Sequence, residues 1–384
     1  MQPLSRRSSA THLQALRRAS GGEFVSSPRT ESVDRSVSSS GAAPENRHFS
    51  LDIRLARFTD LPSINSIERV YPLWQPQLSV SGYRPANSVL AARVGRETGK
   101  PQMMVAESNG EIIAFADFKP SMPDHRWLLQ AFGASTGVYD PGPVWEEVLA
   151  AGIRQAGMNG VKRLYARATG GTNANIALRG AGFAPYAVET IYVVDSPRTL
   201  GADVAMREQE STDTWAIHQL YNASVPRNVL YAEALTSHTW DISRSRRPGA
   251  RQTIGWLVDD GSNIGAYVRV TSDHGVHCVD ITFALGAVKR ASALLDAVLR
   301  RLRLEKRIAR VYIALRDYQQ ELEPALARLG FTPGLTQELL VRYTAVPIRA
   351  VTVEAPAQHV ELGDRVPSQA PSILTVTPKQ SGNE

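Results

Sequence analysis

Apolar and polar residues alternate in some stretches of the middle of the chain and recur at helical spacing in others. Two apolar runs meet at Asn109-Gly110, a pair that tolerates positive φ, so 103–118 is predicted to form a β-hairpin. Apolar positions from Ala291 to Leu302 recur every three or four residues and predict one buried helical face. Further strands are expected at 53–56, 126–134, 163–168, 188–195, 204–206, 277–285, 309–315 and 338–346, a second hairpin around Asp260-Gly261, and helices opened by Asp60 and Asp213.

The order of these elements occurs twice. The segment ALRGAGF begins at 177 and ALARLGF begins at 325, and each ends an expected helix with glycine followed by phenylalanine. Glycine at that position supplies a left-handed C-cap, and the phenylalanine is expected to pack back into the core. An offset of about 150 residues is kept along the chain, which predicts a duplicated α/β unit. The matched positions are Ile113 and Ile264, Tyr165 and Tyr312, Gly182 and Gly330, and Phe183 and Phe331.

The length of 384 residues exceeds one ordinary core and suits two domains with tails. Residues 1–48 are rich in Ser and Arg and poor in large apolar residues, so we expect a disordered extension or a misplaced start; an amphipathic targeting segment is the alternative. Domains are expected at 49–200 and 201–350, followed by a disordered tail over 351–384.

The chain carries 43 Lys and Arg against 37 Asp and Glu, a formal net charge of +6. Such a balance suits nucleic acid, membrane surfaces or anionic ligands, but it also follows from a GC-rich genome that favours arginine. The chain has no run of about 18 apolar residues, so no membrane span is predicted. The single cysteine, Cys278, excludes an internal disulfide and fits a reducing compartment, so we expect a cytoplasmic protein.

The order strand, helix, hairpin, strand, helix, strand, short helix with Gly-Phe, strand resembles the GCN5-related N-acetyltransferase (GNAT) family, in a tandem pair. The resemblance covers roughly 51–194 and 203–345 and is carried best by the two Gly-Phe helix ends and the two hairpins ending in IIAF and IGAY. It implies two GNAT-like domains of α+β class, each a mixed, mostly antiparallel sheet flanked by helices.

The resemblance also implies a site for acetyl-CoA as cosubstrate. In the family, the fourth and fifth strands splay apart, and the start of the next helix binds the pyrophosphate within a Gln/Arg-x-x-Gly-x-Gly/Ala motif. Unpaired backbone N–H groups and the positive end of the helix dipole explain the binding of an anion there. A base on a strand takes a proton from the amine, and a tyrosine on the later short helix often protonates the thiolate.

The first half departs from this motif. Gly142 occupies the first small position, but Val144 occupies the second, and Pro141 and Pro143 lack N–H groups. Glutamates at 146 and 147 add negative charge to the first turn, which opposes a phosphate.

The second half is the better phosphate site on physical grounds, since no amide is lost there. Ala291 fits the final small position, whereas Lys289 and Gly286 stand where the motif has Gly and Gln or Arg. Lys289 and Arg290 bring cations, so the predicted coenzyme site is Gly286, Ala287, Lys289, Arg290 and Ala291; a basic, solvated helix start is the alternative.

The expected catalytic groups are also incomplete. Leu178 and Leu326 stand where the family often has its tyrosine, and leucine cannot donate a proton. Asp280 falls where many members place an acidic residue, and it is the predicted base; Gln130 is its counterpart in the first half and cannot titrate. A strand-end carboxylate bonded to a neighbouring amide is the alternative for Asp280.

Other motifs carry less chemistry. His277 and Cys278 point to opposite faces of a strand and cannot easily share a metal ion. The segment ATGGTN at 168–173 lacks the lysine of a P-loop, and Thr172 or Asn173 suits an N-cap. The arginine-rich run 243–252 has no interleaved aromatics, which favours a solvated loop over a nucleic-acid surface.

Three hypotheses for function follow. The first is an acyl-CoA-dependent N-acyltransferase, acting on an unknown small-molecule or peptide amine mainly through the second half. The second is a non-catalytic protein of the same fold that senses a CoA-type ligand or docks a partner. The third and weakest is a polyanion binder using the basic tail and loop. The acceptor and the oligomeric state stay open.

Overall fold

The computed structural model describes residues 51–67, 69–72, 89, 102–121, 126–138, 140–242, 252–261, 263–273, 275–305 and 310–344. The tails expected at 1–48 and 351–384 and most of the arginine-rich run lie outside them. The first series of elements is β1 (Asp52–Leu55), η1 (Phe58–Asp60), α2 (Leu61–Asn65), β2 (Arg69–Pro72), β3 (Gln102–Ser108), β4 (Glu111–Ser121), β5 (Arg126–Ala134), α5 (Gly142–Met158), β6 (Arg163–Ala168), α6 (Asn173–Gly180) and β7 (Ala184–Val194).

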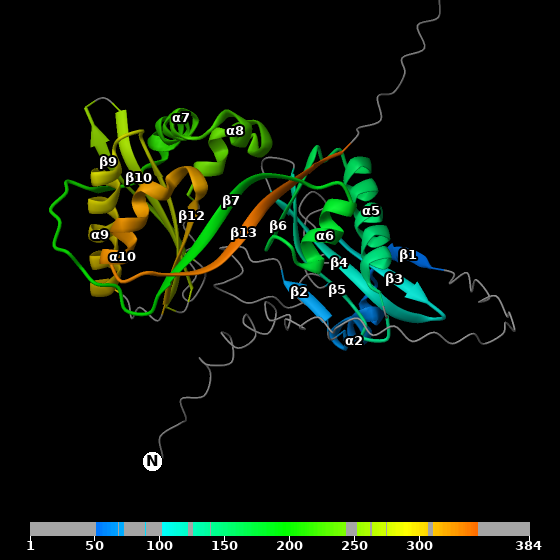
Figure 1. Ribbon diagram of the computed structural model, residues 1–384. Coiled ribbons are helices and arrows are strands. Elements are labelled where there is room, and N and C mark those ends of the chain that lie inside the picture. The colour runs from blue at the N-terminus through cyan, green and yellow to red at the C-terminus, as the bar shows by residue number, and fades with distance from the viewer. Residues whose placement is uncertain are drawn as a thin grey trace, which may run out of the picture. The chain divides into compact units, whose positions relative to one another are not determined.

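Among the described residues, the second series follows the same order, except that helix α8 and η4 lie between α7 and β9 where the first series has β2 (Figure 1). Its elements are β8 (Arg207–Glu208), η3 (Ser211–Asp213), α7 (Thr214–Ser224), α8 (Arg227–Glu233), η4 (Ser237–Trp240), β9 (Gln252–Asp260), β10 (Asn263–Asp273), β11 (Val276–Phe283), α9 (Val288–Glu305), β12 (Arg310–Arg316), η5 (Asp317–Leu322), α10 (Glu323–Arg328) and β13 (Thr332–Tyr343). The predicted mixed and mostly antiparallel class is confirmed.

The described strands form one sheet in the order β1-β3-β4-β5-β6-β13-β7-β12-β11-β10-β9-β8. The last strand of each series is exchanged. Strand β13 lies between β6 and β7, and β7 lies between β13 and β12. Each series therefore completes its sheet with a strand from the other.

Each series contains one parallel strand pair that diverges. In the second series, β11 pairs with β12 from Val276 to Val279 and then separates from it. In the first, β5 pairs with β6 only from Arg126 to Leu128. We call the gap beyond each paired part the wedge.

The two wedges differ in what lies beside their edge. Strand β2 pairs with β5 at residues 131–134, on the edge that faces the first wedge (Figure 1). In the second series, β11 has only β10 and β12 as strand partners in the described part of the chain. The first wedge is therefore occupied by the protein's own backbone, whereas none of the described strands lies in the second.

Helix α9 covers one face of the second series. Its predicted apolar face is buried in full and packs with alternate residues of β9–β12. Tyr267 and Leu257 project to the other face, against α7. This face, which carries α7 and α8, also holds a cavity that Tyr221 and Glu233 of these helices line.

The turn and cap predictions are confirmed. Asn109 and Gly110 both have positive φ, as a tight hairpin requires. Gly182 and Gly330 follow α6 and α10 with φ of 81° and 90°, and the next residue of each, a phenylalanine, is buried. The second hairpin turns between Asp260 and Asn263, as expected for a hairpin around Asp260-Gly261.

The strand predicted at 204–206 is wrong in position, because the pairing with β9 occurs at Arg207 and Glu208. Val204 and Met206 instead pack against the second core. Their apolar character reflects this packing and not a strand edge.

One ion pair occurs in both series. Arg54 donates from both terminal nitrogens to Asp60 at 2.7 and 3.0 Å, and Arg207 does the same to Asp213 at 2.7 Å. Each aspartate also accepts the backbone N–H three residues earlier, at 2.6 and 2.7 Å, and closes the turn before its helix. The duplication therefore includes this arginine–aspartate pair, which the sequence pattern alone did not reveal.

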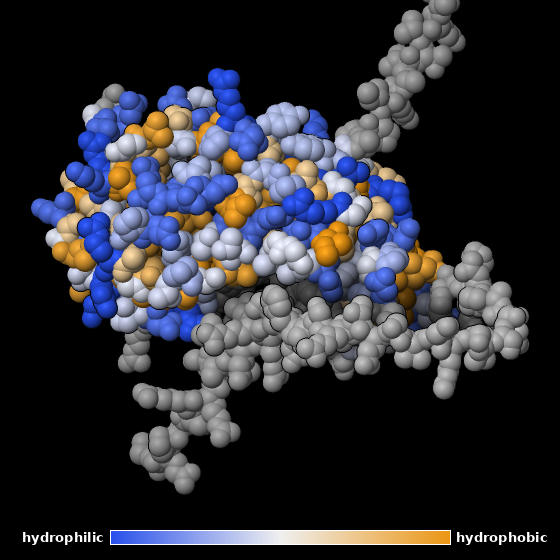
Figure 2. Space-filling view, in the orientation of Figure 1, coloured by the Kyte–Doolittle hydropathy of each residue, from blue (hydrophilic) through white to orange (hydrophobic). Residues whose placement is uncertain are grey.

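Apolar and polar residues are interspersed over the face drawn in Figure 2. Among the described helices, none is long and apolar enough to cross a membrane.

Candidate active site

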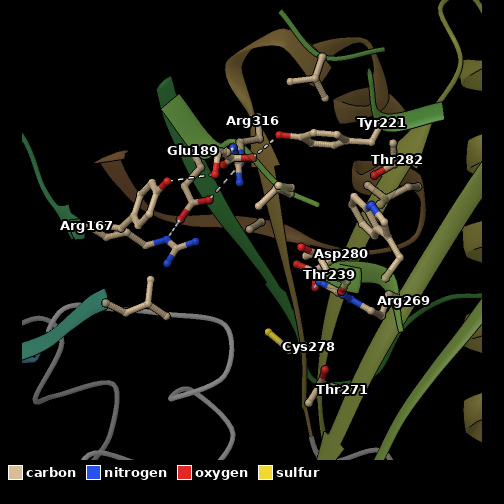
Figure 3. A pocket seen from close by; sticks show the side chains of 18 of the residues that line it. Arg167, Glu189, Tyr221, Thr239, Arg269, Thr271, Cys278, Asp280, Thr282 and Arg316 are labelled. Carbon is tan, nitrogen blue, oxygen red and sulfur yellow. Dashed lines mark hydrogen bonds and ion pairs between the residues drawn. The ribbon is translucent and has the colours of Figure 1, made fainter. Parts of the chain in front are cut away.

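A cavity of about 450 Å³ opens over the strands near the junction of the two series (Figure 3). Strands β5, β6 and β7 supply one side of its lining, and β10, β11 and β12 supply the other. The turn after α8 and η4 add a third side. A volume of this size is typical of small-molecule sites.

The predicted base, Asp280, lines this cavity. It lies on β11 just past the paired part, and its side chain is 41% exposed. Arg269 on the neighbouring β10 approaches it at 3.4 Å and also donates to the carbonyl of Thr239 at 3.0 Å. Asp280 is thus a carboxylate that is open to the cavity and held by one cation.

A second carboxylate, Glu233, lies at the end of α8 and is almost fully buried. It accepts hydrogen bonds from Tyr221 at 2.6 Å, Arg316 at 2.6 Å and Tyr186 at 3.2 Å. Burial by itself would raise the pKa of Glu233, but the Arg316 guanidinium and the Tyr221 hydroxyl outweigh it and hold this pKa below its usual value. Glu233 therefore stays ionised and fully bonded, so it suits a structural role better than proton transfer.

The turn after Glu233 is fixed from the first series. The Tyr165 hydroxyl donates to the carbonyls of Ala232 and Glu233 at 2.7 and 3.0 Å, which satisfies the end of α8. The following residue, Ala234, has a left-handed backbone with φ of 41°, which is costly for a residue with a β-carbon. The cavity wall is thus built by contacts between the series.

Gln319 of η5 bridges the two strands that border the second wedge. Gln319 donates to the carbonyl of Ile281 on β11 at 2.9 Å and accepts the N–H of Arg316 on β12 at 3.2 Å. One side-chain amide therefore spans a gap that the strands no longer bridge directly.

Tyr318, the neighbour of Gln319 in η5, also lines the cavity, and burial raises the pKa of Tyr318 to about 12. This phenol stays protonated at neutral pH. Leu178 and Leu326, at the positions where the family often has its tyrosine, are buried core residues. No motif in the sequence pointed to Tyr318, which lies eight residues before Leu326.

The predicted coenzyme residues lie at the open end of the second wedge, outside the cavity lining. Gly286 has φ of 77° and nothing within 4 Å of where a β-carbon would be, so the backbone there is open to close approach. Ala287 precedes the first helical residue, and the first-turn N–H groups of α9 have no acceptor within the helix.

The side chains of that helix start are of three kinds. Lys289 is exposed, Arg290 forms an ion pair with Asp260, and Ala291 is fully buried in the core. An anion would therefore meet backbone amides and Lys289, with Arg290 partly committed elsewhere. These residues suit a pyrophosphate.

The first series offers a poorer site at each corresponding point. The N–H of Gly142 donates to the Asp140 side chain at 3.1 Å, so a carboxylate already lies at that helix start. Gln130, the counterpart of Asp280, is buried and bonded to Asp117 at 3.5 Å.

Three features define the architecture: the element order, the two diverging parallel strand pairs, and a helix that connects the two strands of each pair. The chain has the GNAT fold in tandem.

Solved structures include similar chains of this kind. A tandem GNAT protein from the clavulanic acid biosynthesis pathway is 14% identical, covers 77% of this chain and 99% of its own, and has a TM-score of 0.44. A GCN5-related N-acetyltransferase from Sphaerobacter thermophilus is 12% identical over 76% of this chain and 95% of its own, with a TM-score of 0.48. One from Anabaena variabilis is 11% identical over 77% and 73%, with a TM-score of 0.41. No family model and no curated protein matches the chain.

Proposed function

We propose that this tandem GNAT protein is an acyl-CoA-dependent N-acyltransferase, most simply an acetyltransferase, whose reaction takes place in the second series. The observation that carries the proposal is the second wedge, which none of the described strands enters and which lies between a helix start suited to an anion and a cavity lined by Asp280.

The residues that would hold the cosubstrate are those at the start of α9. The amides after Gly286 and the Lys289 side chain would face the pyrophosphate, and the Ile281 carbonyl would bond to the pantetheine arm once Gln319 turns away. When bound, acyl-CoA supplies an activated acyl group. Asp280 would accept the proton that the acceptor nitrogen loses, and Tyr318 would donate one to the departing sulfur.

The test is acyl transfer from acetyl-CoA to a panel of amines, followed by thiol release. Asp280→Asn removes the proton acceptor and is expected to lower kcat by roughly a hundredfold or more. Asp203→Asn is the matched control, because Asp203 is exposed in the same series and does not line the cavity. Full activity in Asp280→Asn would show that another group is the base.

The second candidate function, sensing of a CoA-type ligand without turnover, is favoured by one observation. Gln319 already bonds to both edges of the wedge, so ligand exchange at this point would open or close a link between β11 and β12. Binding of free CoA with no acyl transfer to any amine would support this function over catalysis.

A further inference from the structure

The cavity has an excess of positive charge at the end that lies toward the first series. Arg126, Arg167 and Glu189 of the first series line this end, together with Arg316 on β12 and Glu233 on α8 of the second. Both carboxylates are engaged from within the cluster. Glu189 accepts from Arg167 at 2.9 Å, and Glu233 accepts from Arg316 at 2.6 Å. Three guanidinium groups therefore face two carboxylates.

Arg167 is the cation of this cluster that can bind a ligand. Its Nε bonds to Glu189, and its two terminal nitrogens have no acceptor among the described residues. Glu189 also accepts from Gln337 at 2.7 Å and lies 3.7 Å from Arg316, so its charge is shared between two cations. The terminal edge of a guanidinium suits a carboxylate or phosphate in a two-point contact.

The opposite side of the cavity has an excess of negative charge. Asp280 and Asp241 line it with one guanidinium, that of Arg269. Both carboxylates are substantially exposed, at 41% and 56%. Figure 3 shows Arg167 on one side of the cavity and Asp280 with Arg269 on the other. The cavity is therefore polarised between the two series.

The separation between these ends is set by the strand order. Arg167 lies on β6 and Asp280 on β11, with β13, β7 and β12 between them. At about 4.8 Å per strand, the strand axes are roughly 19 Å apart, and the arginine side chain shortens the gap. An α-amino acid is too short to reach both ends. An extended peptide gains about 3.5 Å per residue, so three to five residues span the distance.

We propose that the acceptor is a short peptide, or an equally long amine, whose terminal carboxylate binds Arg167 while its amino group lies at Asp280. This inference rests on the proposed function and adds its substrate class. It also assigns a task to the first series, whose own wedge is occupied by β2. The first series holds the anionic end of the substrate for chemistry performed in the second.

The test measures binding to the full chain by calorimetry with four probes: alanine, tri-alanine, tetra-alanine and tetra-alanine C-terminal amide. Tetra-alanine is expected to bind at least tenfold more tightly than its amide and than alanine. Arg167→Gln should weaken binding of the free acid at least tenfold and leave the amide unchanged. Arg154→Gln, an exposed arginine on α5 outside the cavity, should change neither.

Equal binding of the free acid and the amide to the native protein would overturn the inference, as would equal weakening of both by Arg167→Gln. If Arg167→Gln does not fold, the comparison of acid with amide on the native chain decides alone. Peptide acids that bind but are never acylated would sink the proposed function and leave this site standing. Acylation of peptide amides as fast as peptide acids would support the proposed function and overturn the carboxylate site at Arg167.

Discussion

At the scale of single residues, the proton donor of the proposed reaction is the clearest example of a group found by position and not by motif. Tyr318 reaches the cavity from η5, whereas the position where the family has its tyrosine is a buried leucine. Its raised pKa suits donation and not acceptance, because the phenol remains protonated across the working range of pH.

Tyr318→Phe is expected to lower kcat by roughly a hundredfold with little change in KM, because it removes a proton donor and not a binding contact. Since the pKa of Tyr318 is about 12, the native enzyme should lose no activity through this group up to about pH 10. Tyr231→Phe is the matched control, because Tyr231 is 70% exposed and does not line the cavity. A steady-state pH profile of both variants checks this; unchanged kcat in Tyr318→Phe contradicts it.

At the scale of elements, the repeated Gly-Phe helix ends show how a short word specifies local structure. In both copies the glycine N–H bonds to the carbonyl three residues back, at 2.8 and 3.0 Å, and the phenylalanine N–H to the carbonyl five back, at 3.0 Å. This bonding pattern needs a left-handed residue, so glycine is required at both places for the same reason.

Gly330→Ala should reduce the free energy of unfolding by about 1 kcal/mol, because a β-carbon in the left-handed region is strained although space is available. Gly182→Ala should cost more, since its β-carbon would lie 3.1 Å from the Arg342 guanidinium carbon. Gly137→Ala, where φ is not positive, is the control. Denaturant unfolding measures all three; a Gly330→Ala protein as stable as the control would refute the cap argument.

The two wedges are a second comparison between elements. Because β2 pairs with the edge of β5 and Asp140 caps the helix start, the first series should bind no CoA. Titration calorimetry with acetyl-CoA is expected to give one site per chain. Two equivalent sites would mean that β2 leaves the edge of β5 in solution.

At the scale of the whole molecule, the exchanged strands and the buried ion pairs hold the two series together. The domain boundaries near residues 200 and 350 remain a proposal, because the sheet itself runs on through β13 and β7. Arg316 on β12 bonds to Glu233 at the end of α8 and approaches Glu189 on β7, so one arginine links three elements.

Acid should weaken this structure. The pKa values of Asp60 and Asp213 are lowered by their arginine partners, and that of Glu233 is lowered despite burial. A lowered pKa contributes stability that is present above the unfolded pKa, about 4, and is lost as pH falls through the folded value. The free energy of unfolding is therefore expected to fall steadily below about pH 4.

Glu233→Gln isolates one of these contributions. At pH 7 it should cost about 3 kcal/mol, because Arg316 loses a buried partner. The difference from the native protein should shrink as pH falls, since protonation then removes the same charge. Urea unfolding between pH 3 and 7 measures it; a difference that stays constant with pH would show that Glu233 is not ionised in the folded chain.

Local patterns in the sequence determined the elements, their repetition and the glycine caps, and they are the source of the proposal that Asp280 and the start of α9 form the site. These depend on residues close together in the chain, where periodicity, turn chemistry and missing N–H groups act directly. Tertiary structure alone decided the exchange of β7 and β13, the occupation of the first wedge by β2, and the polarised cavity that places Arg167 opposite Asp280. Each of these joins segments that lie far apart in the sequence, and the pairing of strand edges and the burial of charge depend on which edges and charges meet in space.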